Sequence, residues 1–204
     1  MHPEILSLSL FMFATSCSPG PNNIVASYSG FNFGLAKTIP HMCGVVFGFT
    51  TLVIVMNFGL INIFKKFQIL QEILKYTGSI FLIYLAYKIA FSKNISNEFS
   101  NNPVKFIETF FFQFLNPKAV IVSIIMVSTY VEKGDNFINY SIWVIGVAFI
   151  FACFSIMFWT ILGKFLRSKL LINLSDSSSA IVTGVSSSLI FIAEFLFCII
   201  TLAA

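Results

Sequence analysis

The chain has 204 residues, of which 57% are hydrophobic and only 10% are charged, and its mean hydropathy is +0.92. A soluble fold of this length cannot hide so much apolar surface from water, so the composition excludes a soluble enzyme, a nucleic-acid binder and a disordered chain. The net charge of +4 is modest and suits loops that lie near anionic lipid. We therefore expect an all-α integral membrane protein that crosses the bilayer several times, with no enzymatic activity, no cofactor and no nucleic-acid partner.

Six stretches are long and apolar enough to form a membrane-spanning helix of about 20 residues. They are Ile5 to Tyr28, Leu35 to Phe64, Ile69 to Phe91, Phe106 to Val131, Phe137 to Phe165 and Ala180 to Leu202. The third is the least apolar, because Glu72 and Lys75 enter its first turns. An even number of spans places both termini on one side of the membrane, and the distribution of Lys and Arg between the loops favours the outer side.

The first span is interrupted by Pro19, Gly20 and Pro21. The two prolines remove two backbone donors and clash with a continuing helix, while the glycine permits the turn between them. The helix from Ile5 to Cys17 is about 20 Å long at 1.5 Å per residue, which puts the interruption deep in the membrane. The helix must therefore stop and restart, and two asparagines place their side-chain amides at the restart.

The fourth span is interrupted in a similar way at Asn116, Pro117 and Lys118. Asparagine is among the best helix caps and proline is favoured at the first position of a helix, so these residues predict the start of a second half-helix. The preceding helix, which begins at Phe106, is about 16 Å long, roughly half of a hydrocarbon core near 30 Å thick. Lys118 is therefore expected near the middle of the bilayer.

The two interruptions lie nearly half the chain apart and predict a repeat. A polar segment from Lys93 to Lys105 divides the sequence into residues 1–97 and 98–204, with three expected spans in each part. Because three is odd, the second part enters the membrane in the opposite direction, as in the two inverted three-helix repeats of many secondary transporters. Two independent helix kinks are the alternative, since proline is common in membrane helices.

An interrupted helix survives in hydrocarbon only where it is buried in protein or lines a polar cavity, so the interruptions mark a site. Two half-helix N-termini that face each other present unpaired N–H groups and positive dipole ends, which together form an anion site. Lys118 adds a full positive charge, and the carboxylate of a small zwitterion such as an amino acid would neutralise it. The predicted substrate-binding residues are Pro19, Gly20, Pro21, Asn22, Asn23, Asn116, Pro117 and Lys118.

Two further titratable residues lie within the expected spans. Glu194 has apolar neighbours on both sides in the last span, where an ionised carboxylate is costly, so it is a candidate proton carrier. An ion pair with Lys118 and a neutral structural carboxylic acid are the alternatives. His41 follows Pro40 near the start of the second span. A histidine titrates near neutral pH, but we expect this one at the membrane interface.

Small residues recur at a spacing typical of close helix packing in lipid, at Ser27, Gly30, Gly34, Gly44 and Gly48. Glycine lets two helix backbones approach closely, and such contacts hold helices together where no water is present. We therefore expect these residues at contacts between helices.

Two other classes of membrane protein compete with a transporter of small organic molecules. A thiol-disulfide relay uses a similar broken architecture but needs a cysteine at each interruption, and only the first has one, Cys17. A metal exporter would find soft ligands in Cys17, Met42 and Cys43, but no cluster of carboxylates or thiolates lies at one depth. The sequence does not exclude a membrane scaffold, but a scaffold would not need polar groups in the middle of the bilayer.

Two motifs resemble the LysE/RhtB family of amino-acid exporters. The first is Ser18-Pro19-Gly20-Pro21-Asn22-Asn23, followed by spaced glycines and Pro40-His41. The second is Gln113-Phe114-Leu115-Asn116-Pro117-Lys118-Ala119, and the third span is similar over Tyr76-Thr77-Gly78 to Tyr84-Leu85. The resemblance implies a multi-pass transporter of the bacterial inner membrane that exports amino acids or close derivatives and is driven by the proton gradient. Its partners would be a small zwitterionic substrate, protons and membrane lipid, with a homodimer left open.

Within that family, the two consecutive asparagines resemble the branch that includes cysteine and O-acetylserine exporters. Some positions depart from the family pattern. Thr109 stands where the family usually has glycine, Glu194 lies where the last span is usually uncharged, and Ser175 to Ser179 match little. Substrate choice and coupling are therefore the properties that the resemblance supports least.

Overall fold

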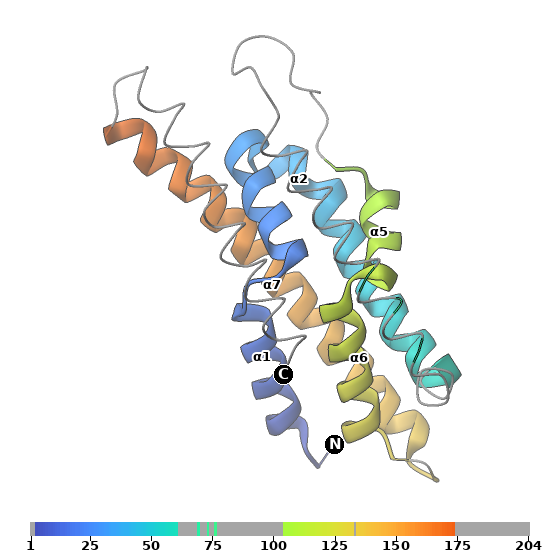
Figure 1. Ribbon diagram of the computed structural model, residues 1–204. Helices are drawn as coiled ribbons and strands as arrows, with labels where there is room; N and C mark the ends of the chain where they lie inside the picture. Colours follow the sequence, from blue (N-terminus) through green and yellow to red (C-terminus); the bar gives the residue numbers. More distant parts are fainter. Residues whose placement is uncertain are drawn as a thin grey trace.

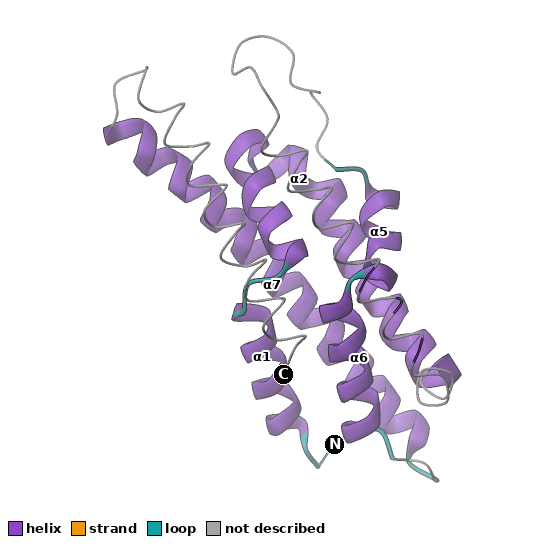
Figure 2. Ribbon diagram, in the orientation of Figure 1, coloured by secondary structure: helices purple, strands orange, loops and turns teal. Residues whose placement is uncertain are grey.

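The computed structural model describes residues 3–60, 69, 73, 76, 104–132 and 134–173. Every regular element in this part of the chain is a helix, as Figure 1 and Figure 2 show. The expected all-helical class is thereby confirmed. Most of the third expected span, the polar segment after it, and all of the sixth span with Glu194 lie outside the described residues.

The helices form two pairs joined at short breaks, together with one long helix. α1 covers Ile5–Cys17 and α2 covers Pro21–Val55, followed by a short π-helix, η1, at Met56–Leu60. α5 covers Phe106–Leu115, α6 covers Pro117–Tyr130 and α7 covers Phe137–Asn173. Among these, two helices are long and apolar enough to cross a membrane, and a third span is added if α5 and α6 count as one bent helix. The protein is therefore an integral membrane protein.

The two broken spans run in opposite directions in Figure 1. α1 and the first part of α2 rise from the lower end of the view, whereas α5 and α6 descend from the upper end. α7 crosses the molecule from one end to the other. This arrangement brings the two proline motifs together midway along the helices.

α2 changes direction at Gly34, whose φ of 76° and ψ of 177° are not helical. Residues with a side chain rarely adopt this φ, so the position favours glycine. No atom of the described residues lies within 4 Å of the place that a Cβ would take. Among these residues Gly34 therefore does not pack against another helix, contrary to the expectation, and its role is the turn between the first and second spans. Thr38 Oγ1 supports the turn by donating to the Gly34 carbonyl at 2.7 Å.

Glycines bring α2 and α7 into direct backbone contact. A Cβ at Gly30 would collide with the carbonyl oxygen of Thr160, and one at Gly163 would collide with the carbonyl oxygen of Ser27. Close packing of this kind holds helices together in lipid, where the hydrophobic effect does not drive their association. The predicted packing role of Gly30 and Ser27 is confirmed.

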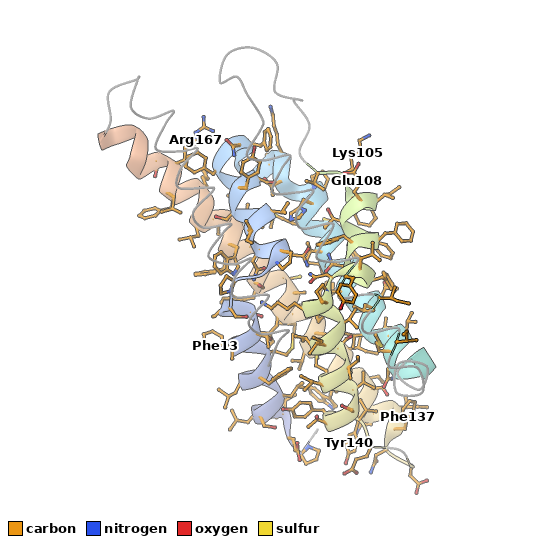
Figure 3. All side chains as sticks on the ribbon, viewed as in Figure 1. Phe13, Lys105, Glu108, Phe137, Tyr140 and Arg167 are labelled. Atoms are coloured by element: carbon orange, nitrogen blue, oxygen red, sulfur yellow. The ribbon has the colours of Figure 1, made fainter. Side chains whose placement is uncertain are left out.

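Arg167, the only arginine in the sequence, ties α7 to the turn of α2. Its Nη1 donates to the carbonyl oxygens of Phe31 at 3.1 Å and Asn32 at 3.0 Å, which precede the turn. Figure 3 shows Arg167 at the same end of the molecule as Lys105 and Glu108. Charged side chains thus gather at a helix end, where a membrane protein meets water.

Below the breaks, the helices pack through an apolar core. Leu8 of α1, Met126 of α6 and Val144 of α7 are almost completely buried in it. Large apolar side chains also cover the outer surface, and Phe13 in Figure 3 projects outward from α1. Extensive exposed apolar surface suits contact with lipid chains.

Candidate functional site

The first break occupies Ser18, Pro19 and Gly20, which lie outside any helix. Ser18 has φ −72° and ψ 135°, and Gly20 has φ −168° and ψ 169°, so both are extended. The helix restarts at Pro21, whose missing N–H costs nothing at the first helical position. The predicted stop and restart is confirmed.

The carbonyl groups at the end of α1 bind side chains from other helices. Ser16 O accepts from Trp159 Nε1 at 3.1 Å and from Ser155 Oγ at 3.1 Å, both on α7. Asn23 Nδ2 donates to Ser18 O at 3.1 Å and to Ser16 O at 3.4 Å. Asn23 is buried, so its amide fastens the start of α2 to the end of α1.

Lys118 reaches across from α6 to the same break. Its Nζ donates to Ser18 O and Ser18 Oγ, each at 2.7 Å, and to Pro19 O at 3.4 Å. A Cβ at Gly20 would lie 2.8 Å from Lys118 Cδ, so the glycine leaves room for the lysine side chain. The charge therefore lies at the negative end of α1, although its own backbone lies at the positive end of α6. The alternative pairing with Glu194 involves a residue outside the described part.

The second break is a single residue, Asn116, where the chain bends by 63° between α5 and α6. Asn116 Oδ1 accepts from the backbone N–H of Lys118 at 3.1 Å, and Pro117 is the first residue of α6. The prediction of an asparagine cap followed by proline at the first helical position is confirmed.

A reciprocal pair of amides joins the two broken spans. Asn22 Nδ2 donates to Gln113 Oε1 at 2.7 Å, and Gln113 Nε2 donates to Asn22 Oδ1 at 3.2 Å. Gln113 Nε2 also donates to Thr109 O at 2.9 Å, so the glutamine is held on α5 while it binds α2. Gln113 is fully buried, and its hydrogen bonds offset the cost of placing an amide there.

A pocket of about 80 Å³ lies between the two breaks. Both half-helix starts reach it, because the first turns of α2 and α6 contribute lining residues. Other parts of the lining come from α1, α5, α7 and the second part of α2. The lining residues are Met12, Thr15, Ser16, Gly20, Pro21, Asn22, Asn23, Val45, Phe49, Gln113, Asn116, Lys118, Ala119, Val122, Phe151, Ala152 and Ser155.

Most of the predicted site residues therefore meet at one place. Those that line the pocket are Gly20, Pro21, Asn22, Asn23, Asn116 and Lys118. Pro19 contributes its carbonyl to Lys118 instead, and Pro117 is buried at the start of α6. That these residues bind a substrate stays a prediction.

Comparison with known proteins places the chain in a family. The sequence model of the LysE type translocator matches residues 13–199, which is nearly the whole chain. The chain belongs to the LysE translocator family. The resemblance of its two proline motifs to that family is thereby confirmed, and no solved structure gives a significant match.

Curated relatives of this LysE family protein carry the name cysteine/O-acetylserine efflux protein. One from Salmonella paratyphi A is 28% identical over 167 residues, which are 80% of this chain and 84% of the relative. One from Klebsiella pneumoniae subsp. pneumoniae is 29% identical over 156 residues, 74% of this chain and 76% of the relative. One from Escherichia coli O1:K1 is 27% identical over 170 residues, 80% and 84% of the two chains. These names agree with the resemblance of Asn22 and Asn23 to the branch that includes cysteine and O-acetylserine exporters.

The alternative hypothesis of a metal exporter has no ligand set to support it in the described part of this LysE family protein. No group of three or more His, Cys, Asp and Glu side chains there could hold a metal ion. The free cysteines Cys17, Cys43 and Cys153 do not line the pocket. The thiols in the described part of the chain are thus not gathered at the site.

Gln113 and Ser155 line the pocket but were not among the predicted site residues. The sequence signal for Gln113 is an amide in an apolar helix, one turn before Asn116 and near the middle of the bilayer, where polar groups are costly. Ser155 carries no such signal, because serine is common in membrane helices and only the packing of α7 brings it to the first break.

His41 is covered by a neighbouring helix, whereas its expected position at the membrane interface stays a prediction. It is 2% exposed, and its Nδ1 lies 3.0 Å from Thr109 Oγ1 on α5. The reason is Gly44, one turn further along α2, which lets the backbone of α5 approach so closely that the ring is covered.

Proposed function

We propose that this LysE family protein is a secondary transporter that exports amino acids or close derivatives across the inner membrane of a bacterium. The observation that carries the proposal is the pocket where two broken helices meet, since a break in hydrocarbon is tolerated where it lines a polar cavity. The names of the curated relatives support the same substrate class. Neither enzymatic activity nor a cofactor is part of the proposed function.

The proposed architecture is six spans in two inverted three-helix repeats, residues 1–97 and 98–204. The opposite directions of the two broken spans support it. Reporter fusions provide a test: a reporter joined after residue 97 follows three spans and should lie on the opposite side of the membrane from both termini. A reporter there on the same side as the N-terminus would contradict the proposed repeat.

We propose that the substrate carboxylate binds beside Lys118 and the first turns of α2 and α6. Lys118 Nζ already donates to oxygen atoms of the first break, so a carboxylate oxygen would join or replace one of these acceptors. The N–H groups of the first helical turns and the positive dipole ends favour the same negative group. The substrate ammonium would find acceptors in the amide oxygens of Asn22 and Gln113.

The size of the pocket favours a substrate with a short side chain. A cavity of about 80 Å³ corresponds to roughly five to eight water-sized volumes of about 10–15 Å³ each. Met12, Val45 and Phe49 add apolar walls to it. Cysteine and O-acetylserine suit such a site better than arginine or an aromatic amino acid.

Export against a concentration gradient needs an energy source, and we propose the proton gradient across the inner membrane. Glu194 stays the candidate proton carrier that the sequence indicated, with the ion pair to Lys118 and a neutral structural role as its alternatives. Transport and coupling are separate properties, so one can be lost without the other.

Efflux from cells that express the protein tests the proposed function. Cells loaded with radiolabelled cysteine, O-acetylserine, lysine or phenylalanine are followed with and without a protonophore. We expect faster loss of cysteine and O-acetylserine than from vector controls, and no such acceleration once the proton gradient is collapsed. Transport of a divalent metal ion without any amino acid would instead support a metal exporter.

A further inference from the structure

We infer that His41 takes up and releases the coupling proton of this transporter, an inference that rests on the proposed function. The observations behind it are the burial of the imidazole, the hydrogen bonds of its two nitrogens, and its place between α5 and the start of α2.

The imidazole is enclosed by close helix contact. His41 is 2% exposed, and Thr109 on the facing helix is also 2% exposed. A Cβ at Gly44 would lie 2.6 Å from Phe106 O and 2.8 Å from Thr109 Cβ, so α2 and α5 touch directly beside the ring. The contact between α2 and α5 thus covers this side of the ring.

The hydrogen bonds assign the ring proton. Thr109 Oγ1 donates to Lys105 O at 3.1 Å, and a hydroxyl has one hydrogen to give. The 3.0 Å contact between Oγ1 and His41 Nδ1 is then a second hydrogen bond when the ring hydrogen is on Nδ1, and this is the tautomer that we assign. Nε2 is then a lone-pair acceptor in the neutral ring.

Within the described part of the chain, Nε2 has no hydrogen-bond partner, which is unusual for a buried polar atom. The backbone of Asn22, at the start of α2, stands beside the ring. A proton that arrives from water forms an N–H bond at Nε2 and turns the ring into a cation with two donors. The proton leaves to water on the other side of the membrane when that bond breaks, so the ring returns to its neutral form.

Protonation of Nε2 creates a second donor that needs a hydrogen-bond acceptor at the start of α2. A buried imidazolium is costly unless each donor has an acceptor, and Thr109 already serves Nδ1. The second donor therefore draws the backbone of Asn22 toward the ring. The neutral ring needs no acceptor at Nε2. The protonated and the neutral ring therefore favour two different positions of the start of α2.

This movement reaches the pocket through two hydrogen-bonded amides. The side chain of Asn22 lines the pocket and pairs with Gln113, which is held by Thr109 O on the helix that also holds the imidazole. A shift of Asn22 relative to α5 alters this pair, and with it the polar wall of the substrate site. The proton site and the substrate site thus act on one segment.

No charged side chain in the described part of these elements bonds to the ring. Lys37 on α2, and Lys105 and Glu108 on α5, are exposed at the helix ends. Lys118 on α6 is directed to the first break. The other titratable side chains described on α2, α6 and α7 have no hydrogen bond to the imidazole, namely Tyr28, Cys43, Tyr130, Tyr140, Cys153, Lys164 and Arg167.

Proteoliposomes that contain His41→Gln test the inference by separating exchange from accumulation. Exchange of radiolabelled cysteine, kept reduced, across a membrane without a pH gradient needs no net proton transfer. We expect exchange within about twofold of the wild type. Accumulation driven by an imposed pH gradient should fall by more than about tenfold, together with the pH change that cysteine induces. Retained accumulation, or equal loss of exchange in a folded variant, would overturn the assignment.

Thr109→Val is a second variant that tests the inference if His41→Gln does not fold. This variant preserves the shape of the residue but removes the acceptor of Nδ1, so the pH dependence of accumulation should shift while exchange is retained. Thr160→Val is the matched control, because Thr160 is a fully buried threonine that bonds only to its own helix, at Ile156 O. An unchanged pH profile in Thr109→Val would count against the inference.

Two comparisons distinguish this inference from the proposed function. Glu194→Gln tests the other candidate carrier: selective loss of accumulation in Glu194→Gln, with none in His41→Gln, would overturn the inference and leave the proton with Glu194. A wild-type protein that neither exchanges nor accumulates any amino acid would instead refute the proposed function.

Discussion

The two helix breaks share a proline but are held in different ways. At the second break, Asn116 caps α6 with its own side chain, and its partner is the backbone N–H of Lys118, two residues away. At the first break, side chains from α6 and α7 bind the carbonyl groups of Ser16 and Ser18. One break is therefore local, and the other is assembled from distant parts of the chain.

This difference follows from how much backbone each break leaves outside a helix. Asn116 alone separates α5 from α6, whereas Ser18, Pro19 and Gly20 separate α1 from α2. The longer break exposes more carbonyl groups that water cannot reach in a membrane, so other helices must supply donors. The conformation of the first break thus depends on side chains from the second half of the chain. The conformation of the second break depends mainly on its own sequence.

The largest loss of export is expected for Lys118→Ala. It removes the cation of the proposed substrate site and two short charge-assisted hydrogen bonds at the first break, worth about 1.5–3 kcal/mol each. Export in the cell assay should fall by more than about a hundredfold, or 2.7 kcal/mol. Lys164→Ala, at an exposed position of α7, is the matched control. Undiminished export by Lys118→Ala would end the proposed role of this lysine.

Asn23→Ala should lower stability more than Asn22→Ala, because the two asparagines serve different contacts. Asn23 bonds to Ser16 O and Ser18 O, so its loss should destabilise the first break by about 2 kcal/mol. Asn22 pairs with Gln113, and its loss should cost about 1 kcal/mol while affecting export more. Thermal unfolding midpoints in detergent and efflux rates measure the two effects. Equal losses of stability and export would contradict this division.

Trp159→Phe should weaken the first break by about 1 kcal/mol, since it removes one hydrogen bond to Ser16 O and keeps an aromatic ring. The expected result is a lower thermal unfolding midpoint. Trp143→Phe, on an exposed face of α7, serves as the control and should leave the midpoint unchanged. If both variants unfold alike, α7 does not support the first break through its indole.

The smallest effects are expected at the second break. Asn116→Ala removes the cap of α6 and should cost about 1 kcal/mol, whereas Asn116→Ser keeps a capping oxygen and should cost only a few tenths. The thermal unfolding midpoint again provides the measurement. A loss in Asn116→Ser as large as in Asn116→Ala would show that the asparagine does more than cap its helix.

The sequence predicted both breaks because their causes are local. Proline cannot continue a helix wherever it stands, and Asn116 meets its capping partner two residues later. The same local rules placed Pro117 at the first position of its helix. The meeting of the two breaks at one pocket could be expected only through the repeat, since no local rule joins residues so far apart in the chain.

The missed features depend on packing between distant segments. Trp159 binds the first break from a helix with no motif around it, and Gln113 acquires its role from its partner Asn22. The neighbours of His41 in sequence do not show that α5 covers it. Gly34 was expected in a helix contact, since spacing alone cannot distinguish a packed glycine from one that turns the chain.

Gly34 lets one long helix serve two neighbours. The part of α2 before Gly34 contacts α7 at Gly30 and is bonded to Arg167, while the part after it lies directly on α5 at Gly44. A side chain at position 34 would strain the φ of 76°, so a single substitution there would disturb the contacts of α2 with both α7 and α5. The amide pair between Asn22 and Gln113, which borders the pocket, depends on those same contacts.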